Sequence, residues 1–188
     1  MVCVFFFRKK LPSYVHFLSS SLFMTITRRI IGIDPGLTGG AAFITDEKLC
    51  KWLGSPVEGI VVASEIGAKV FLENVHAFPG QGSTSTFNFG RAFGLVLGAA
   101  EALKVDIVLV SPQRWQTALL ERPEGMSTKE AAMKFVEKTF GLDGFTVGRS
   151  RKPHSGYVDA ACIAYWGLMY GETYTPPAPK KKLKLISF

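Results

Sequence analysis

A short apolar segment that ends in an acidic residue constrains the fold of this chain more than any other feature. Residues 30–33 are apolar with one glycine, the pattern of a buried strand. Asp34 follows at once, then turn residues, and residues 41–44 predict the returning strand. A carboxylate at the end of a core strand is costly unless it is paired, and a bound cation is the usual partner. The alternative is that Asp34 only caps a tight turn.

The remaining pattern gives strands first and then helices alternating with strands. The predicted strands are 29–34, 39–46, 48–54, 69–74 and 105–110. The predicted helices are 89–103, a segment from the capping box at 127–130 to near Gly141, and 158–170. The shape of residues 55–68 stays open, because Gly59 and Gly67 work against a long helix.

Tight turns join the first three strands, which are therefore expected to form an antiparallel meander. The later strands are separated by helical segments and are expected to be parallel. The sequence thus predicts an α/β fold of the ribonuclease H-like type, with a mixed five-stranded sheet flanked by helices.

Two further acids occupy positions that would bring them close to Asp34. Glu73 follows the apolar residues 70–72, and open α/β sheets place their sites at the carboxyl ends of their strands. Asp159 lies at the start of the final helix, among small residues that let this helix approach the sheet. The structural alternative for Asp159 is a favourable interaction with the helix dipole.

Three converging carboxylates suit Mg²⁺ or Mn²⁺, because these hard cations prefer oxygen ligands, whereas zinc prefers Cys and His. Without cations the carboxylates would repel one another and shift each other's pKa. Two divalent ions about 4 Å apart would relieve this repulsion and serve in-line displacement at phosphorus. The acids therefore predict a phosphodiesterase site with Mg²⁺ or Mn²⁺, two ions per site.

The composition fits a polyanionic substrate. The 188 residues carry a net charge of +7, and a basic excess favours nucleic acid as a partner. An apolar content of 47% excludes a disordered chain, and the length suits one domain with a sizeable core. The three cysteines, Cys3, Cys50 and Cys162, are far apart and odd in number, which disfavours a disulfide framework and indicates a reducing compartment.

Four segments, in this order, resemble the RuvC-type Holliday-junction resolvases, and more closely their phage, bacterial and chloroplast branch. They are Gly32-Ile33-Asp34-Pro35-Gly36, Leu72-Glu73-Asn74-Val75, residues 87–94 with the helix that follows, and the Asp159-Ala160-Ala161 helix. Residues 111–116 are also similar to that branch, and the likeness covers residues 28–170. It implies a homodimeric, metal-dependent endonuclease, acting in DNA recombination and repair, that nicks two opposed strands of a four-way DNA junction.

The chain departs from this family at one place. The family usually has His or Asp three or four residues before the last acid, whereas here those positions hold Gly156 and Ser155. His154 lies five residues before Asp159, and near a helix start it can still reach the site. We expect His154 either to act on the attacking water or a metal, or else to bind phosphate or have no special role.

The segment after Glu73 is expected to contact DNA. Residues 76–86 are rich in small and hydroxyl side chains. Phe78 is suited to stack on a base at an opened junction, a contact of about 1–3 kcal/mol, or else it packs locally. Ser83, Thr84 and Ser85 can donate hydrogen bonds to phosphates.

Basic side chains flank these elements. Arg91 lies in the helix after the segment and is expected to bind phosphate, with a surface salt bridge as the alternative. Arg149, Arg151 and Lys152 precede His154 and would clamp the cleaved strand, unless they belong to an ordinary solvated loop.

Paired cuts require a dimer, and the helical segment 90–102 is rich in small residues that permit close helix contact. This segment either forms the dimer interface or packs only on its own sheet.

We expect a nuclease domain at residues 28–172 between two different ends. Residues 1–27 contain no acid and are either a targeting peptide, which would place the protein in a chloroplast or mitochondrion, or the result of an upstream start. A start at Met24 would place it in the cytoplasm or nucleoid. The apolar stretch 11–24 is too short and serine-rich to span a membrane. Residues 173–188 form a Pro- and Lys-rich basic tail.

Two other functions fit part of the pattern. The segment 33–39 also resembles the phosphate loop of actin-like ATPases and sugar kinases, but those proteins need a second such loop and domain. A catalytically inactive relative that binds junctions without cutting them is the other alternative, because of the displaced His154.

Overall fold

The computed structural model describes residues 28–46, 50–76 and 80–175. The two ends, residues 1–27 and 176–188, and the expected base-stacking residue Phe78 lie outside the described residues. Among the described residues, no helix is both long enough and apolar enough to cross a membrane.

A mixed sheet forms the centre of the molecule, as the sequence predicts. Its strands are β1 (Arg29–Asp34), β2 (Gly40–Thr45), β3 (Cys50–Gly54), β4 (Lys69–Glu73) and β5 (Ile107–Val110). They lie in the order β3-β2-β1-β4-β5, with β1, β2 and β3 antiparallel and β1, β4 and β5 parallel. The α/β fold class and the antiparallel meander are therefore confirmed.

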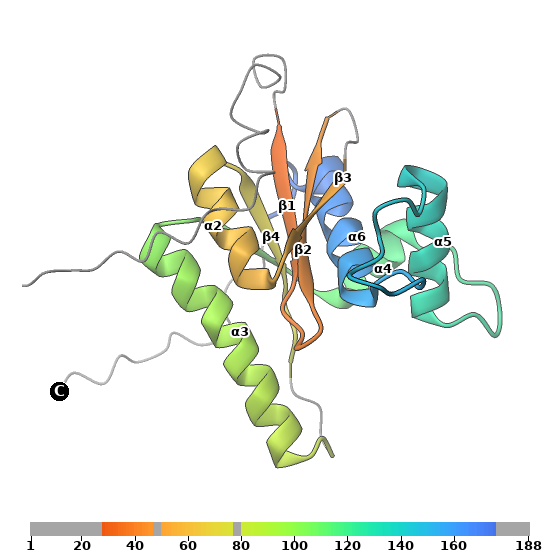
Figure 1. Ribbon diagram of the computed structural model, residues 1–188, viewed down its shortest axis with the longest axis horizontal. Helices are drawn as coiled ribbons and strands as arrows, with labels where there is room; N and C mark the ends of the chain where they lie inside the picture. Colours follow the sequence, from red (N-terminus) through yellow and green to blue (C-terminus); the bar gives the residue numbers. More distant parts are fainter. Residues whose placement is uncertain (1–27, 47–49, 77–79, 176–188) are drawn as a thin grey trace, which may run out of the picture.

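Helices cover both faces of this sheet (Figure 1). They are α2 (Pro56–Ile66), α3 (Ser83–Leu103), α4 (Pro112–Leu119), α5 (Thr128–Phe140) and α6 (Ser155–Tyr170). Ile31 and Ile33 of β1 pack in one apolar cluster with residues of α2 and α3, while Ile30 packs in a second cluster with residues of α4, α5 and α6. Because successive side chains of a strand point to opposite faces, β1 contributes residues to two separate apolar clusters.

The final helix lies directly against the central strand because a glycine allows it to. A Cβ atom on Gly32 of β1 would lie 2.2 Å from the carbonyl oxygen of Ala160, so no larger residue fits beneath α6. Helix α6 is buried along almost its whole length. It begins at Ser155, three residues earlier than predicted, with His154 at its N-cap.

The segment between β3 and β4, whose structure the sequence left undecided, forms helix α2. Its two glycines do not prevent the helix. Ser55 and Glu58 form a capping box at its start, and Gly67, with φ of 65°, ends it in the left-handed conformation. A Cβ on Gly59 would lie 2.3 Å from the Cβ of Ala41, so this glycine lets the helix approach the sheet. The expectation that these glycines work against a long helix was wrong for Gly59, which lies inside α2, and right for Gly67, which ends it.

Two further helical segments differ from the prediction. Helix α3 starts at Ser83 rather than at residue 89, so the expected DNA-contacting segment 76–86 is helical in its last four residues. Residues 112–119, for which no element was predicted, form α4.

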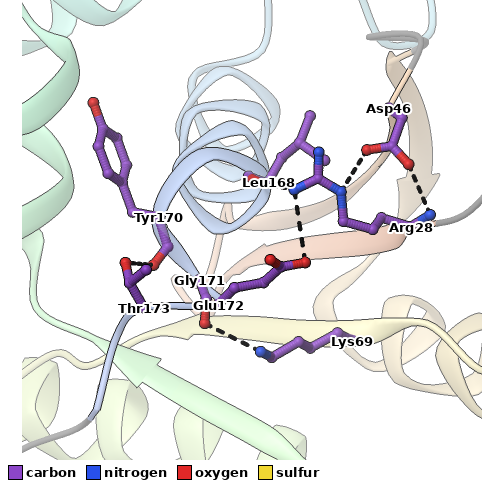
Figure 2. A network of polar contacts seen from close by, with 8 residues as sticks. All are labelled: Arg28, Asp46, Lys69, Leu168, Tyr170, Gly171, Glu172 and Thr173. Atoms are coloured by element: carbon purple, nitrogen blue, oxygen red, sulfur yellow. Dashed lines mark hydrogen bonds and ion pairs between the residues drawn. The ribbon is translucent and has the colours of Figure 1, made fainter.

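Polar contacts fasten the start of β1 to the end of α6 (Figure 2). The Arg28 side chain bonds Asp46 after β2 and the carbonyl oxygen of Leu168 in α6. Lys69 of β4 donates to the carbonyl oxygen of Gly171 at 3.1 Å. Tyr174 also packs edge-on against Trp166, so the packed region extends two residues beyond the expected boundary at 172.

Candidate active site

Asp34 ends β1 and begins the turn into β2. Its Oδ1 accepts a hydrogen bond of 2.9 Å from the backbone N–H of Gly36, which is the turn-capping contact that the sequence allowed. The turn is too tight for a larger residue at Gly39, where a Cβ would lie 2.1 Å from the Asp34 carbonyl oxygen. The carboxylate is half-buried at the carboxyl edge of the sheet.

Glu73 lies beside Asp34 because β1 and β4 are parallel neighbours. Ile33 pairs with Leu72, so the next residue of each strand, Asp34 and Glu73, ends its strand at the same level. Only 9% of Glu73 is exposed, and its Oε1 accepts a hydrogen bond of 2.8 Å from the indole N–H of Trp115.

Helix α6 brings Asp159 to the same edge. A Cβ on Gly156 would lie 2.2 Å from the Thr38 carbonyl oxygen, so the start of the helix rests on the β1–β2 turn. Ala160 lies over Gly32 of β1. Asp159 lies between these two contact points, which places its carboxylate near the end of β1.

The electrostatics show that the three acids share one environment. Burial, reinforced by the charges of Asp34 and Asp159, raises the pKa of Glu73 to about 7, although the Trp115 hydrogen bond opposes the shift. Burial and the charge of Asp34 raise the pKa of Asp159 to about 7. Burial also raises the pKa of Asp34, while the Gly36 hydrogen bond and the nearby His154 lower it.

His154 reaches this group of acids despite its displaced position in the sequence. Its backbone N–H donates to the Phe145 carbonyl oxygen at 2.8 Å, which fixes it at the N-cap of α6. Its ring packs at 5.7 Å from the Trp52 ring. Among the described residues its Nδ1 is one of the buried polar atoms without a hydrogen-bond partner. A buried nitrogen of this kind calls for a water, ion or ligand atom beside it.

The donor set suits a divalent cation, but the site is open. In the described part of the chain, no group of three or more His, Cys, Asp or Glu side chains is arranged closely enough to hold a metal ion by itself. Mg²⁺ is usually held by one or two carboxylates together with waters and substrate phosphates, and it does not need such a cage. Neighbouring carboxylates add to the effect of burial in raising the pKa of Glu73 and Asp159, and a divalent cation would relieve this repulsion.

The expected DNA contacts lie on two exposed segments. Ser83, Thr84 and Ser85 are exposed in the first turn of α3, and Arg91 is exposed two turns further along. Arg149, Arg151 and Lys152 are exposed in the loop that leads to His154. The loop cations therefore directly precede His154 in the sequence. All of these exposed side chains are accessible to a polyanion.

Two residues near the acids were not assigned to the site from the sequence, although one of them, Trp115, lies in the segment 111–116 that resembles the resolvases. Lys129, in the first turn of α5, is close enough to Asp159 to lower its pKa. Trp115 comes from α4, which was not predicted. The capping box that predicted the start of α5 placed Lys129 on a helix, but no pattern in the sequence indicated which side chains its first turn faces.

Comparison with solved structures identifies the fold. The chain matches Thermus thermophilus RuvC in complex with a Holliday-junction substrate with a TM-score of 0.51 at 20% identity, covering 77% of this chain and 96% of that one. A second T. thermophilus RuvC structure matches with a TM-score of 0.48 at 21% identity over the same shares. Neither the family models nor the curated protein sequences gave a match. The fold predicted from the order of strands and helices is thus the fold of RuvC.

Proposed function

We propose that this protein is a metal-dependent, structure-specific endonuclease that resolves four-way DNA junctions by paired, symmetric nicks in recombination and repair. The observation that carries the proposal is the convergence of Asp34, Glu73 and Asp159 at one edge of the sheet, where the charges of Asp34 and Asp159 help to raise the pKa of Glu73. The fold shared with RuvC, solved on a Holliday junction, and the net charge of +7 support the same conclusion.

Each site residue has a role that follows from its position. Asp34, Glu73 and Asp159 would hold Mg²⁺ or Mn²⁺, two ions per site, which would activate water and stabilise the leaving oxygen. His154, with a buried nitrogen beside Asp34, would accept the proton of the attacking water.

DNA would be held by the exposed residues around the acids. The hydroxyls of Ser83, Thr84 and Ser85 and the guanidinium of Arg91 would contact phosphates along α3. The cations of residues 149–152 would hold the strand that enters the site. Stacking by Phe78 stays a prediction from the sequence.

A homodimer would place two such sites on one junction, and α3 is suited to form its interface. Only Val96 and Ala100 of this helix are buried, while Phe87 and Leu95 are 70% and 59% exposed. A Cβ added at Gly90, Gly94 or Gly98 would meet no described atom within 4 Å, so packing within the described chain does not need these glycines. The N-terminal half of α3 projects past the edge where β1 and β4 end (Figure 1). A second copy packed on this face would explain both the glycines and the exposed apolar side chains.

The test is cleavage of an end-labelled four-way junction in Mg²⁺, in Mn²⁺ and in EDTA, with linear duplex as the control. The proposal expects paired, symmetric nicks in the junction only when metal is present. Asp34→Asn and Glu73→Gln should abolish cutting and leave junction binding largely intact, because phosphate contacts carry the affinity.

Other outcomes would favour the alternatives. Tight binding of the junction by the wild-type protein without any cut would favour a catalytically inactive relative. Absence of binding to either DNA, together with binding of a nucleotide, would favour the actin-like interpretation of residues 33–39.

A further inference from the structure

Glu73 is held by a residue that takes no part in the proposed chemistry. Its Oε1 accepts the 2.8 Å hydrogen bond from Trp115 Nε1, although the two residues lie 42 positions apart in the sequence. Both partners are buried, with 9% of Glu73 and 1% of Trp115 exposed. A hydrogen bond between a buried carboxylate and a buried donor is stronger than the same bond in water, and it fixes the orientation of the carboxylate.

The scaffold around Trp115 leaves its ring little freedom. Helix α4 starts immediately after β5, whose Val110 pairs with Glu73 and accepts a 2.7 Å hydrogen bond from the backbone of Asn74. The preceding residue, Arg114, lies over the Tyr174 ring at 4.8 Å and anchors the outer side of the helix. The indole itself belongs to the core beneath α6.

Indole chemistry suits this position. The Trp N–H can donate a hydrogen bond but cannot accept one, so it always presents a donor to Glu73 Oε1. It adds no charge and cannot itself bind a cation in place of the carboxylate. One oxygen of Glu73 is thus held on the side of α4, and the rest of the carboxylate is oriented with respect to Asp34 and Asp159.

We propose that Trp115 is a positioning residue, which aims the Glu73 carboxylate so that it binds the divalent cation together with Asp34 and Asp159. This inference rests on the proposed function, because it needs a cation at the three acids. A partner that orients a ligating carboxylate typically contributes about 10- to 100-fold to metal affinity or activity.

The first experiment compares two matched core substitutions in the full chain. Trp115→Phe removes the N–H and keeps an aromatic ring. Trp166→Phe is the control, because Trp166 is 3% exposed in the same core cluster and its ring contacts are Phe71, Tyr170 and Tyr174. Binding of Mn²⁺ alone is measured by titration calorimetry without DNA, and circular dichroism checks that each variant is folded.

The expected result is Mn²⁺ binding about tenfold or more weaker in W115F and within about twofold of wild type in W166F. Equal binding by W115F and wild type would overturn the inference and leave the proposed nuclease intact. Equal losses in the two variants would also overturn it, since the loss would then come from the core cavity. Failure of the wild-type protein both to bind Mn²⁺ and to cut junctions would overturn the proposed function and this inference with it.

A second measurement uses the intact tryptophan and does not depend on whether W115F folds. The three tryptophans give three indole N–H signals in ¹⁵N-labelled protein, which W52F and W166F assign. Added Mg²⁺ should shift the Trp115 signal in the wild-type protein and should not shift it in Glu73→Gln. A Trp115 signal that moves as little as that of Trp166 would contradict the inference.

Discussion

Glu73 and Asp159 hold their protons to about pH 7 in the metal-free protein, because their pKa values lie well above the ordinary values of 4.5 and 3.8. Since the folded-state pKa values are raised, the folded protein binds more protons than the unfolded chain between these values. The stability that this contributes is present below the unfolded-state values and is lost as the pH rises through about 7.

We therefore expect the thermal unfolding midpoint in EDTA to fall between pH 5 and pH 8, and Mg²⁺ to raise it again at pH 8. The measurement is thermal unfolding followed by circular dichroism across this range. Glu73→Gln is the control, because it removes one titrating group and should flatten the decline. A decline as steep in Glu73→Gln as in the wild-type protein would contradict this account.

Lys129 offers a second test at the scale of a single side chain. Its charge lowers the pKa of Asp159, so Lys129→Met should raise that pKa further. If ionised Asp159 is needed for cutting, the rise of the cleavage rate with pH should move to higher pH. Lys138→Met, in the last turn of the same helix, is the control and should leave the profile unchanged. Identical pH profiles of the cleavage rate for the two variants would show that Lys129 does not influence Asp159.

The sequence of helix α3 is not explained by packing within a single chain. A glycine in an exposed helix interior costs about 1 kcal/mol relative to alanine, yet Gly90, Gly94 and Gly98 leave open space where a Cβ would lie against the described chain. Replacing Gly94 by Leu should therefore stabilise the isolated helix and disrupt close contact with a second copy.

We expect Gly94→Leu to convert a dimer to a monomer in light scattering coupled to size-exclusion chromatography. The monomer should then cut only one strand of a junction at a time, giving single nicks in place of paired nicks. Glu137→Leu adds the same side chain to an exposed position of α5 and should leave the mass unchanged. A wild-type protein that is monomeric on junction DNA would refute the dimer.

The elements show where sequence patterns succeed and where they do not. Strands were predictable because apolar runs ended at turns and acids, and this same logic located Asp34 and Glu73. Helix α2 was obscured because Gly59 serves close packing, a role that only the neighbouring Ala41 reveals. The first turn of α3 was missed because its serines and threonines are typical of loops.

The site shows a second limit. Three acids at strand and helix ends could be placed from topology, because topology fixes where backbone ends meet. The reach of Trp115 to Glu73 depends on how α4 packs after β5, and the approach of Lys129 to Asp159 depends on the path of α5. Neither contact can be predicted from the periodic pattern of apolar residues along the sequence.

On the scale of the whole molecule, the chain carries a net charge of +7, so DNA affinity should depend steeply on salt. The exposed cations Arg149, Arg151 and Lys152 adjoin the site through His154. Replacing all three by Gln should reduce the slope of log affinity against log salt by about 2–3, since each phosphate that is no longer neutralised reduces it by roughly 0.9.

Junction binding measured by fluorescence anisotropy at several salt concentrations checks this prediction. The control is Lys104→Asn, at the C-cap of α3 on the opposite edge of the sheet, where Asn also tolerates the left-handed conformation. An unchanged slope in the triple variant would show that the loop is solvated and not bound to DNA.

The packing of α6 over Gly32 also orders events during synthesis. Asp34 is synthesised with the first described strand, whereas His154 and Asp159 lie on or next to the last helix of the described chain. The central strand stays uncovered on one face until this helix is made, so the acids come together only after α6 has been synthesised. An interrupted translation product that lacks α6 should therefore lack Asp159 and the complete group of acids, and on the proposed function it should be unable to cut DNA.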